Sequence, residues 1–198
     1  MTKLFIIVSV ITLFIMYICL KFFNNGNKKI KGICYFDIDD TLTTSIENNE
    51  DIINECLDNN FAVGIITASS RDMQHICYKN VSVADWMPDK LCKQFYENKG
   101  KMYNSYITLA GNKKFPSDYP FNETYGFMKG YNMKFGRDSF YPHVPDKAVI
   151  LFDDQKYVLD DVKRFNNNFQ TVCSHPKCGG EYLNKKTVRN IIKKIKNN

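Results

Sequence analysis

The stretch Ile33-Cys34-Tyr35-Phe36-Asp37-Ile38-Asp39-Asp40-Thr41-Leu42-Thr43 decides how the rest of this chain is interpreted. It opens with a short apolar run and changes abruptly to acidic residues, which predicts a buried strand ending at a polar edge. Asp37 and Asp39 are one residue apart, and carboxylates this close repel each other unless a cation compensates them. Oxygen ligands in an incomplete protein cage suit Mg²⁺. A carboxylate can also attack phosphorus, and a second acid can protonate the leaving oxygen.

Two further segments show the same change from apolar to polar residues. The run 61–66 is followed by Thr67, and the run 148–152 is followed by Asp153 and Asp154. A fourth strand is predicted over 169–173, and helices over 46–60, 158–165 and 186–196. Strands that alternate with helices favour an α/β fold with a parallel sheet. Ligands bind beyond the carboxyl ends of such strands, so we expect these polar residues to form one site.

The segment 33–43 resembles the first motif of the haloacid dehalogenase superfamily, an apolar strand followed by Asp-x-Asp-x-Thr. The resemblance implies a three-layer, Rossmann-like parallel sheet with helices on both faces and a small cap or none. It also implies Mg²⁺-dependent hydrolysis of phosphate monoesters through an aspartyl-phosphate. Asp37 would be the nucleophile, and Asp39 the general acid and base whose backbone carbonyl also binds the metal. Thr41 would support the loop and the substrate site.

The family's other motifs follow in the expected order. Thr67 matches the second motif and would hold a phosphoryl oxygen, while Ala68 and Ser69 could add backbone donors at a helix start. Asp153 and Asp154 match the fourth motif and would complete the metal site with Asp37 and Asp39. Which of the two acids binds the metal directly is left open.

The third motif is a single lysine that would neutralise the nucleophile and the incoming phosphate. Lys129 is preferred, because its distance from Asp153 along the chain is typical of the family. Lys134 and Lys147 are the alternatives.

The start of the chain predicts a membrane anchor. Residues 4–20 are uncharged and mostly apolar, which is long enough to span a bilayer as a helix. A cleaved signal peptide is the alternative, but no small-residue cleavage pattern follows the run. We therefore expect an anchor over 1–23, a polar linker over 24–30 and a hydrolase domain over 31–198. The lysines after the run place that domain in the cytoplasm of a single-pass membrane protein.

The seven cysteines and the basic ends give weaker indications. An odd cysteine count without compact spacing favours reduced thiols, although Cys173, His175 and Cys178 could clip a zinc ion. The net charge is +6, with lysines gathered near both ends. Basic ends can attract anionic lipid or nucleic acid, but a solvated helix face is the simpler explanation.

The sequence says least about the substrate. The aromatic-rich range 80–126 could form a small lid, although ordinary packing would also explain its aromatic residues. A phosphorylated substrate is expected, with a phosphoprotein, a nucleotide or a nucleic-acid end as candidates. The competing hypothesis is a catalytically silent, membrane-tethered interaction protein with the same fold. The sequence does not indicate an oligomeric state.

Overall fold

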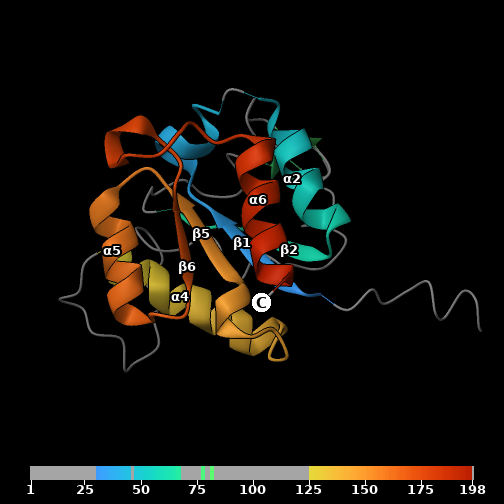
Figure 1. Ribbon diagram of the computed structural model, residues 1–198, viewed down its shortest axis with the longest axis vertical. Coiled ribbons are helices and arrows are strands. Elements are labelled where there is room, and N and C mark those ends of the chain that lie inside the picture. Colours follow the sequence, from blue (N-terminus) through green and yellow to red (C-terminus); the bar gives the residue numbers. More distant parts are fainter. Residues whose placement is uncertain (1–29, 46, 68–76, 79–80, 83–124, 198) are drawn as a thin grey trace, which may run out of the picture.

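A parallel sheet organises the part of the chain that the computed structural model describes, residues 30–45, 47–67, 77–78, 81–82 and 125–197. Its four strands stand in the order β2-β1-β5-β6 (Figure 1). The strands are β1 (Gly32–Phe36), β2 (Phe61–Ile65), β5 (Val149–Asp153) and β6 (Gln170–Cys173). A separate antiparallel pair consists of β3 (Cys77–Tyr78) and β4 (Val81–Ser82).

The helices α2 (Asn49–Asp58), α4 (Tyr125–Phe140), α5 (Lys156–Phe165) and α6 (Lys185–Lys196) flank this sheet. Helix α2 connects β1 to β2 in one direction along the sheet, and α5 connects β5 to β6 in the other. Because such crossovers are right-handed, α2 and α5 cover opposite faces. Helix α6 packs beside α2, and α4 packs beside α5, so each face carries a helix pair (Figure 1).

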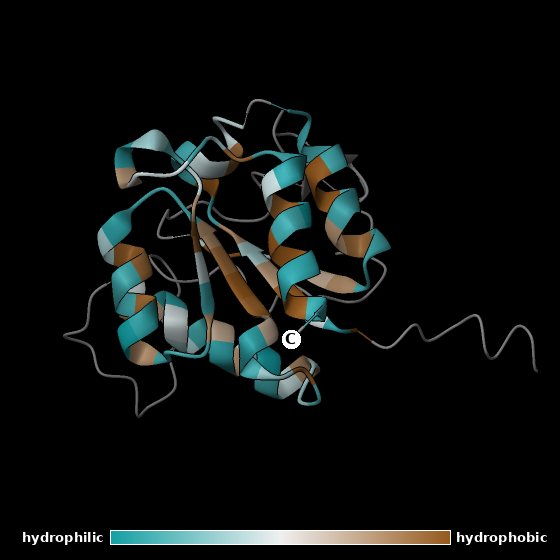
Figure 2. Ribbon diagram, viewed as in Figure 1, coloured by the Kyte–Doolittle hydropathy of each residue, from teal (hydrophilic) through white to brown (hydrophobic). Residues whose placement is uncertain are grey.

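Burial on both faces explains why the central strands are almost continuously apolar. Every residue of β1, β2 and β5 is buried, and these strands are largely brown in the hydropathy view (Figure 2). Neighbouring strands are packed tightly: the rings of Phe36 and Phe152 stack with centroids 4.8 Å apart. At the start of β1, Gly32 leaves no room for a side chain, because a Cβ would collide with the ring of Phe61. The α/β fold with an all-parallel sheet is thus confirmed.

Helix α4 is the main element that the sequence pattern did not predict. Its sequence contains Gly126, Gly130 and Gly136, and glycine is a poor helix former. Two of these glycines have a packing role that explains them. A side chain at Gly126 would collide with Val158 of α5, and one at Gly130 would collide with the ring of Phe165. Glycine therefore weakens the helical signal in the sequence while it allows α4 to approach α5 closely.

Two predicted segments fall outside the described residues. The predicted anchor, 1–23, lies there entirely, as does the linker up to residue 29. No helix within the described ranges is long and apolar enough to cross a membrane. Most of the predicted lid, 80–126, is also outside them, and its last two residues belong to α4. Helix α2 begins at Asn49 rather than at the predicted position 46, with Asn48 as its N-cap.

An ion pair joins α2 and α6, the two helices on one face of the sheet, and its contribution to stability depends on pH. Arg189 of α6 donates from Nε to Glu55 Oε1 at 3.1 Å and from Nη2 to Glu55 Oε2 at 2.9 Å. The hydrogen bonds to Arg189 hold the pKa of Glu55 below its usual value, against the opposing effect of burial. The stabilisation is therefore present above the unfolded-state pKa and is lost as pH falls through the lowered folded-state pKa.

We expect Arg189→Gln to lower the free energy of unfolding at neutral pH by the small amount that is typical of a solvent-exposed ion pair. The difference from wild type should shrink towards zero once the pH falls below the lowered folded-state pKa of Glu55, where Glu55 is protonated in both folded and unfolded protein. Urea unfolding of both proteins from neutral to acidic pH measures this difference in the free energy of unfolding. A difference that stays constant with pH would show that Arg189 stabilises the helix pair through packing and not through charge.

Candidate metal and phosphoryl site

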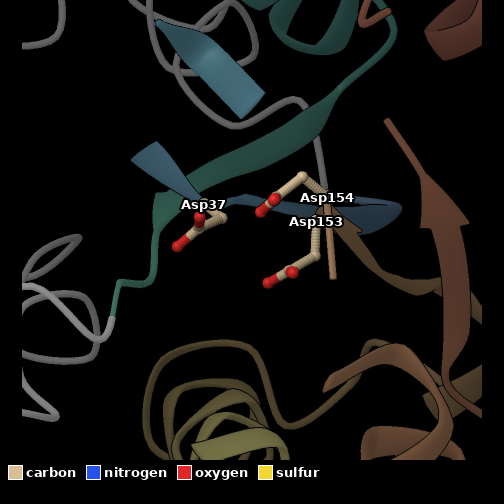
Figure 3. Close-up of side chains that lie close together, drawn as sticks. All are labelled: Asp37, Asp153 and Asp154. Atoms are coloured by element: carbon tan, nitrogen blue, oxygen red, sulfur yellow. The ribbon is translucent and has the colours of Figure 1, made fainter. Parts of the chain in front are cut away.

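The candidate site lies where the chain connections of the sheet diverge. From β1 the chain leads to β2 at one edge, and from β5 it leads to β6 at the other, which makes the carboxyl ends of β1 and β5 a switch point. Asp37 follows β1 directly, Asp153 ends β5, and Asp154 comes next. Figure 3 shows the three side chains gathered beyond the strand ends. Each offers a carboxylate oxygen, and these oxygens all lie within 4.8 Å of one another.

Backbone hydrogen bonds hold these acids in place at the strand ends. The N–H of Asp37 donates to the carbonyl of Phe152 at 3.0 Å, and the N–H of Ser174 donates to the carbonyl of Asp153 at 3.0 Å. The hydrogen-bond ladder of the sheet therefore continues one residue beyond β1 and β6. The acids are carried by rigid backbone, which fixes their separation.

Lys129 bridges two of the three carboxylates. Its Nζ lies 2.7 Å from Asp37 Oδ1 and 2.6 Å from Asp153 Oδ2. The lysine comes from α4, and only 3% of its side chain is exposed. Of the three lysines that the sequence left open, this is the one at the site. Lys134 is exposed and pairs with Asp138, and Lys147 is exposed near the opposite end of β5.

Electrostatics show that the cluster lacks positive charge. Burial raises the pKa of Asp37 to about 7; Lys129 opposes the rise, and Asp153 and Asp154 add to it. Burial and the charge of Asp153 also raise the pKa of Asp154. Burial alone would lower the pKa of Lys129, but the carboxylates of Asp153 and Asp37 outweigh it and raise that pKa. When all three acids are ionised, three carboxylates and one ammonium leave two negative charges, which is the charge that one divalent cation compensates.

These residues fit a magnesium ion. The three ligand groups are all carboxylates, and hard oxygen ligands of this kind are what Mg²⁺ binds. One oxygen of Asp153 accepts from Lys129, and the other accepts from the N–H of Gln155 at 2.9 Å. In Asp37, Lys129 uses Oδ1, and no described residue donates a hydrogen bond to Oδ2. Asp37 Oδ2 is therefore the carboxylate oxygen best placed to bind a cation directly, while Asp154 Oδ2 accepts a hydrogen bond from Gln155 Nε2.

The loop after β1 presents Asp39 at the mouth of the site. Ile38–Leu42 forms a kinked turn, in which the backbone of Asp39 is extended at ψ 132° and Asp40 is in the left-handed region at φ 55°. Aspartate tolerates this conformation better than most residues, and the N–H of Asp40 donates to Thr43 Oγ1 at 3.0 Å. The turn buries Ile38 and Leu42 and leaves Asp39 exposed beside the pocket.

A pocket of about 150 Å³ opens in front of the acids. Thr67, which follows β2, lines it and is buried, as the motif comparison led us to expect for a phosphoryl contact. Ala68 and Ser69 lie outside the described residues. The complete lining consists of Asp37, Asp39, Asp40, Thr67, Lys129, Asp153, Asp154, Gln155, Tyr157 and Val158.

Thr41 is not among the residues that line the pocket. Its side chain is fully buried, and its Oγ1 lies 3.0 Å from Ser174 Oγ at the end of β6. The pair ties the loop that carries Asp37 and Asp39 to the far strand of the sheet. This geometry favours the loop-supporting role over direct contact with substrate. Ser174 has no signal of its own in the sequence, since serine after a strand is common in turns.

We expect Thr41→Val to lower the free energy of unfolding by about 1–3 kcal/mol, because the buried Ser174 hydroxyl would lose its partner. Removing both hydroxyls in Thr41→Val with Ser174→Ala should cost less than the sum of the two single changes. Urea unfolding of the four proteins measures the coupling. Additive effects would mean that the two hydroxyls do not interact.

The segment after β6 differs from the expectation of reduced thiols. Cys173 and Cys178 form a disulfide, so their sulfurs are not available as zinc ligands with His175. The bridge closes a tight turn, Pro176–Cys178, that presents Lys177 towards the site. Lys177 Nζ lies 2.9 Å from Asp40 Oδ2. The sequence spacing alone could not distinguish a disulfide from a metal clip. Cys34 and Cys56 are free and buried.

Comparisons of the chain with protein-family models, with curated proteins and with solved structures found no match. The fold and the site therefore define only a broad class: an α/β protein with a four-stranded parallel sheet, an acidic triad at the switch point and a buried lysine within it.

Proposed function

We propose that this protein is a magnesium-dependent phosphomonoester hydrolase of the haloacid dehalogenase type, with a small cap or none, that works through an aspartyl-phosphate. The observation that carries the proposal is the position of Lys129 between Asp37 and Asp153, with Asp154 within reach of the same ion. Lysine and a cation together would surround a phosphoryl group with positive charge. Such preorganised charge is the main requirement for phosphoryl transfer.

The chemistry assigns each acid a separate role. One carboxylate oxygen of Asp37 attacks phosphorus, the bond between phosphorus and the ester oxygen breaks, and the leaving oxygen takes a proton from Asp39. Asp39, now a carboxylate, removes a proton from water, which attacks the aspartyl-phosphate and releases inorganic phosphate. Asp39 suits this exchange because it is exposed at the pocket while Asp37 is buried.

The remaining residues bind and orient the substrate. Lys129 would donate to a phosphoryl oxygen while it holds Asp37 in position, and the Thr67 hydroxyl would bind a second phosphoryl oxygen. Asp37, Asp153, Asp154 and the backbone carbonyl of Asp39 would hold Mg²⁺. When bound, the ion supplies charge neutralisation for the phosphate. A pocket of about 150 Å³ has room for a phosphoryl group and leaves most of a larger substrate outside.

The test is phosphate release by the full-length chain in neutral detergent from a panel of aryl, alkyl, nucleotide and peptide phosphates. We expect release that requires Mg²⁺ and stops when a chelator is added. Trapping of radioactive phosphate on Asp37 with a labelled substrate would identify the intermediate. Mg²⁺-dependent binding of phosphate without any turnover would contradict the proposal and support the silent, membrane-tethered interaction protein instead.

A further inference from the structure

A group of lysines lies at the opposite end of the sheet from the acidic pocket. We call Lys31, Lys163, Lys193, Lys194 and Lys196 the basic face. Lys31 directly precedes β1, Lys163 lies near the end of α5, and the other three lie in the last turn of α6. Lys163 is half-buried and the others are exposed. The amino ends of the parallel strands meet at this edge, so the basic face and the site are separated by the length of the strands.

Hydrogen bonds show that these segments adjoin one another. Lys196 Nζ donates to Asn59 Oδ1 at 2.6 Å, and the N–H of Lys31 donates to the carbonyl of the next residue, Asn60, at 2.8 Å. The end of α6 and the start of β1 therefore meet at the turn between α2 and β2 (Figure 1). Lys163 is close enough to Lys194 for that like charge, together with burial, to lower the pKa of Lys163.

The charge of the basic face is not compensated within the described residues. Elsewhere on the surface, Lys134, Lys156 and Lys177 each pair with an aspartate. None of the five lysines of the basic face forms a salt bridge with any residue in the described ranges. Of the acids at this edge, Asp146 pairs with Arg137, and Asp58 is exposed at the end of α2. Lys163 Nζ donates to the carbonyls of Asn167 and Phe169, which satisfy its hydrogen bonds but do not balance its charge. Like charges without an opposite charge beside them repel one another, and an anionic ligand at this edge would relieve that repulsion.

The point at which the chain enters the domain indicates which kind of anion binds at the basic face. The carbonyl of Ile30 lies 3.0 Å from His143 Nε2, so the chain enters the domain at the basic edge. The predicted membrane span, 4–20, is joined to that point by the linker 24–30, which also contains Lys28 and Lys29. Seven residues reach about 25 Å when fully extended. If the span crosses a bilayer, the basic face cannot be far from the lipid headgroups.

We propose that the basic face binds the anionic headgroups of the membrane that the predicted span crosses. This contact orients the domain, because strands of five residues place the acidic pocket about 17 Å further from the bilayer. The pocket then opens towards the aqueous side, away from the negative surface that would repel a phosphorylated substrate. This inference goes beyond the proposed hydrolysis and does not depend on it.

Lysine acetylation footprinting tests the contact. The full-length chain is placed in nanodiscs of phosphatidylcholine alone or mixed with phosphatidylserine, treated with an amine-acetylating reagent, and analysed by mass spectrometry. We expect phosphatidylserine to slow acetylation of Lys31, Lys193, Lys194 and Lys196 by about fivefold each, the factor for one basic residue at an anionic surface. Lys186, on the same helix but at the other edge, should react equally in both discs. High salt should remove the difference.

Two matched double variants of α6 distinguish an effect of the basic face from an effect of net charge alone. Lys193→Gln with Lys194→Gln should reduce the protection of Lys31 and Lys196, whereas Lys185→Gln with Lys186→Gln at the start of the helix should not. Equal acetylation in both kinds of disc, or equal slowing at Lys186, would overturn the proposal. So would a chain that does not stay with the discs. A short duplex DNA that protects these lysines when phosphatidylserine does not would overturn it in favour of nucleic acid.

Discussion

Asp37→Asn is expected to abolish phosphate release, with kcat lower by roughly 10⁴- to 10⁶-fold, the range found when a nucleophile is removed. An amide cannot form the acyl phosphate. The folded structure should remain, because the amide keeps an oxygen that can accept from Lys129, as Asp37 Oδ1 does at 2.7 Å. The replacement also removes a carboxylate whose pKa is raised to about 7, chiefly by burial. Phosphate release at saturating Mg²⁺ and a thermal unfolding curve measure the two effects.

Asp39→Asn provides the matched comparison, since it changes the neighbouring acid of the same loop. If Asp39 protonates the leaving oxygen, its loss should matter most for alkyl phosphates, whose leaving groups need the proton, and less for activated aryl phosphates. Asp37→Asn should inactivate both classes equally. An Asp37→Asn protein with wild-type kcat, or an Asp39→Asn protein with the same loss on every ester, would contradict the roles assigned here.

The strands could be predicted from the sequence because burial on both faces leaves a continuous apolar run. Each of β1, β2, β5 and β6 starts and ends within one residue of its predicted bounds. The acids at their ends could be predicted to meet for the same reason, since parallel strands bring their carboxyl ends to one edge. The triad of Asp37, Asp153 and Asp154 is the result.

The contacts made by other parts of the chain could not be derived in this way. Spacing along the chain favoured Lys129, but only the packing of α4 against α5 through Gly126 and Gly130 brings this lysine under the triad. The hydroxyl pair of Thr41 and Ser174 joins positions far apart in the sequence, neither of which has a periodic pattern. Tertiary contacts of single polar residues leave no signal in one sequence.

Lys129→Met is expected to have the largest effect on stability. Methionine fills a similar volume, but Asp37 and Asp153 would stay buried without their shared counter-charge. Removing one partner of a buried ion pair costs about 3–5 kcal/mol. We therefore expect a large fall in the free energy of unfolding in urea without metal, together with loss of phosphate release. Lys134→Met on the same helix is the control, because Lys134 is exposed and pairs with the exposed Asp138; it should change stability by less than about 0.5 kcal/mol.

Magnesium should act more strongly on the Lys129→Met protein than on wild type. With the ammonium gone, three carboxylates face the pocket without compensation, so a divalent cation should bind more tightly and raise the melting temperature further. Thermal unfolding across a Mg²⁺ titration, with Lys134→Met and wild type beside it, measures the difference without relying on turnover. A Lys129→Met protein that unfolds like wild type and gains nothing from Mg²⁺ would mean that the three acids are not held together as one charged cluster, and the case for a shared cation at the ends of β1 and β5 would fail.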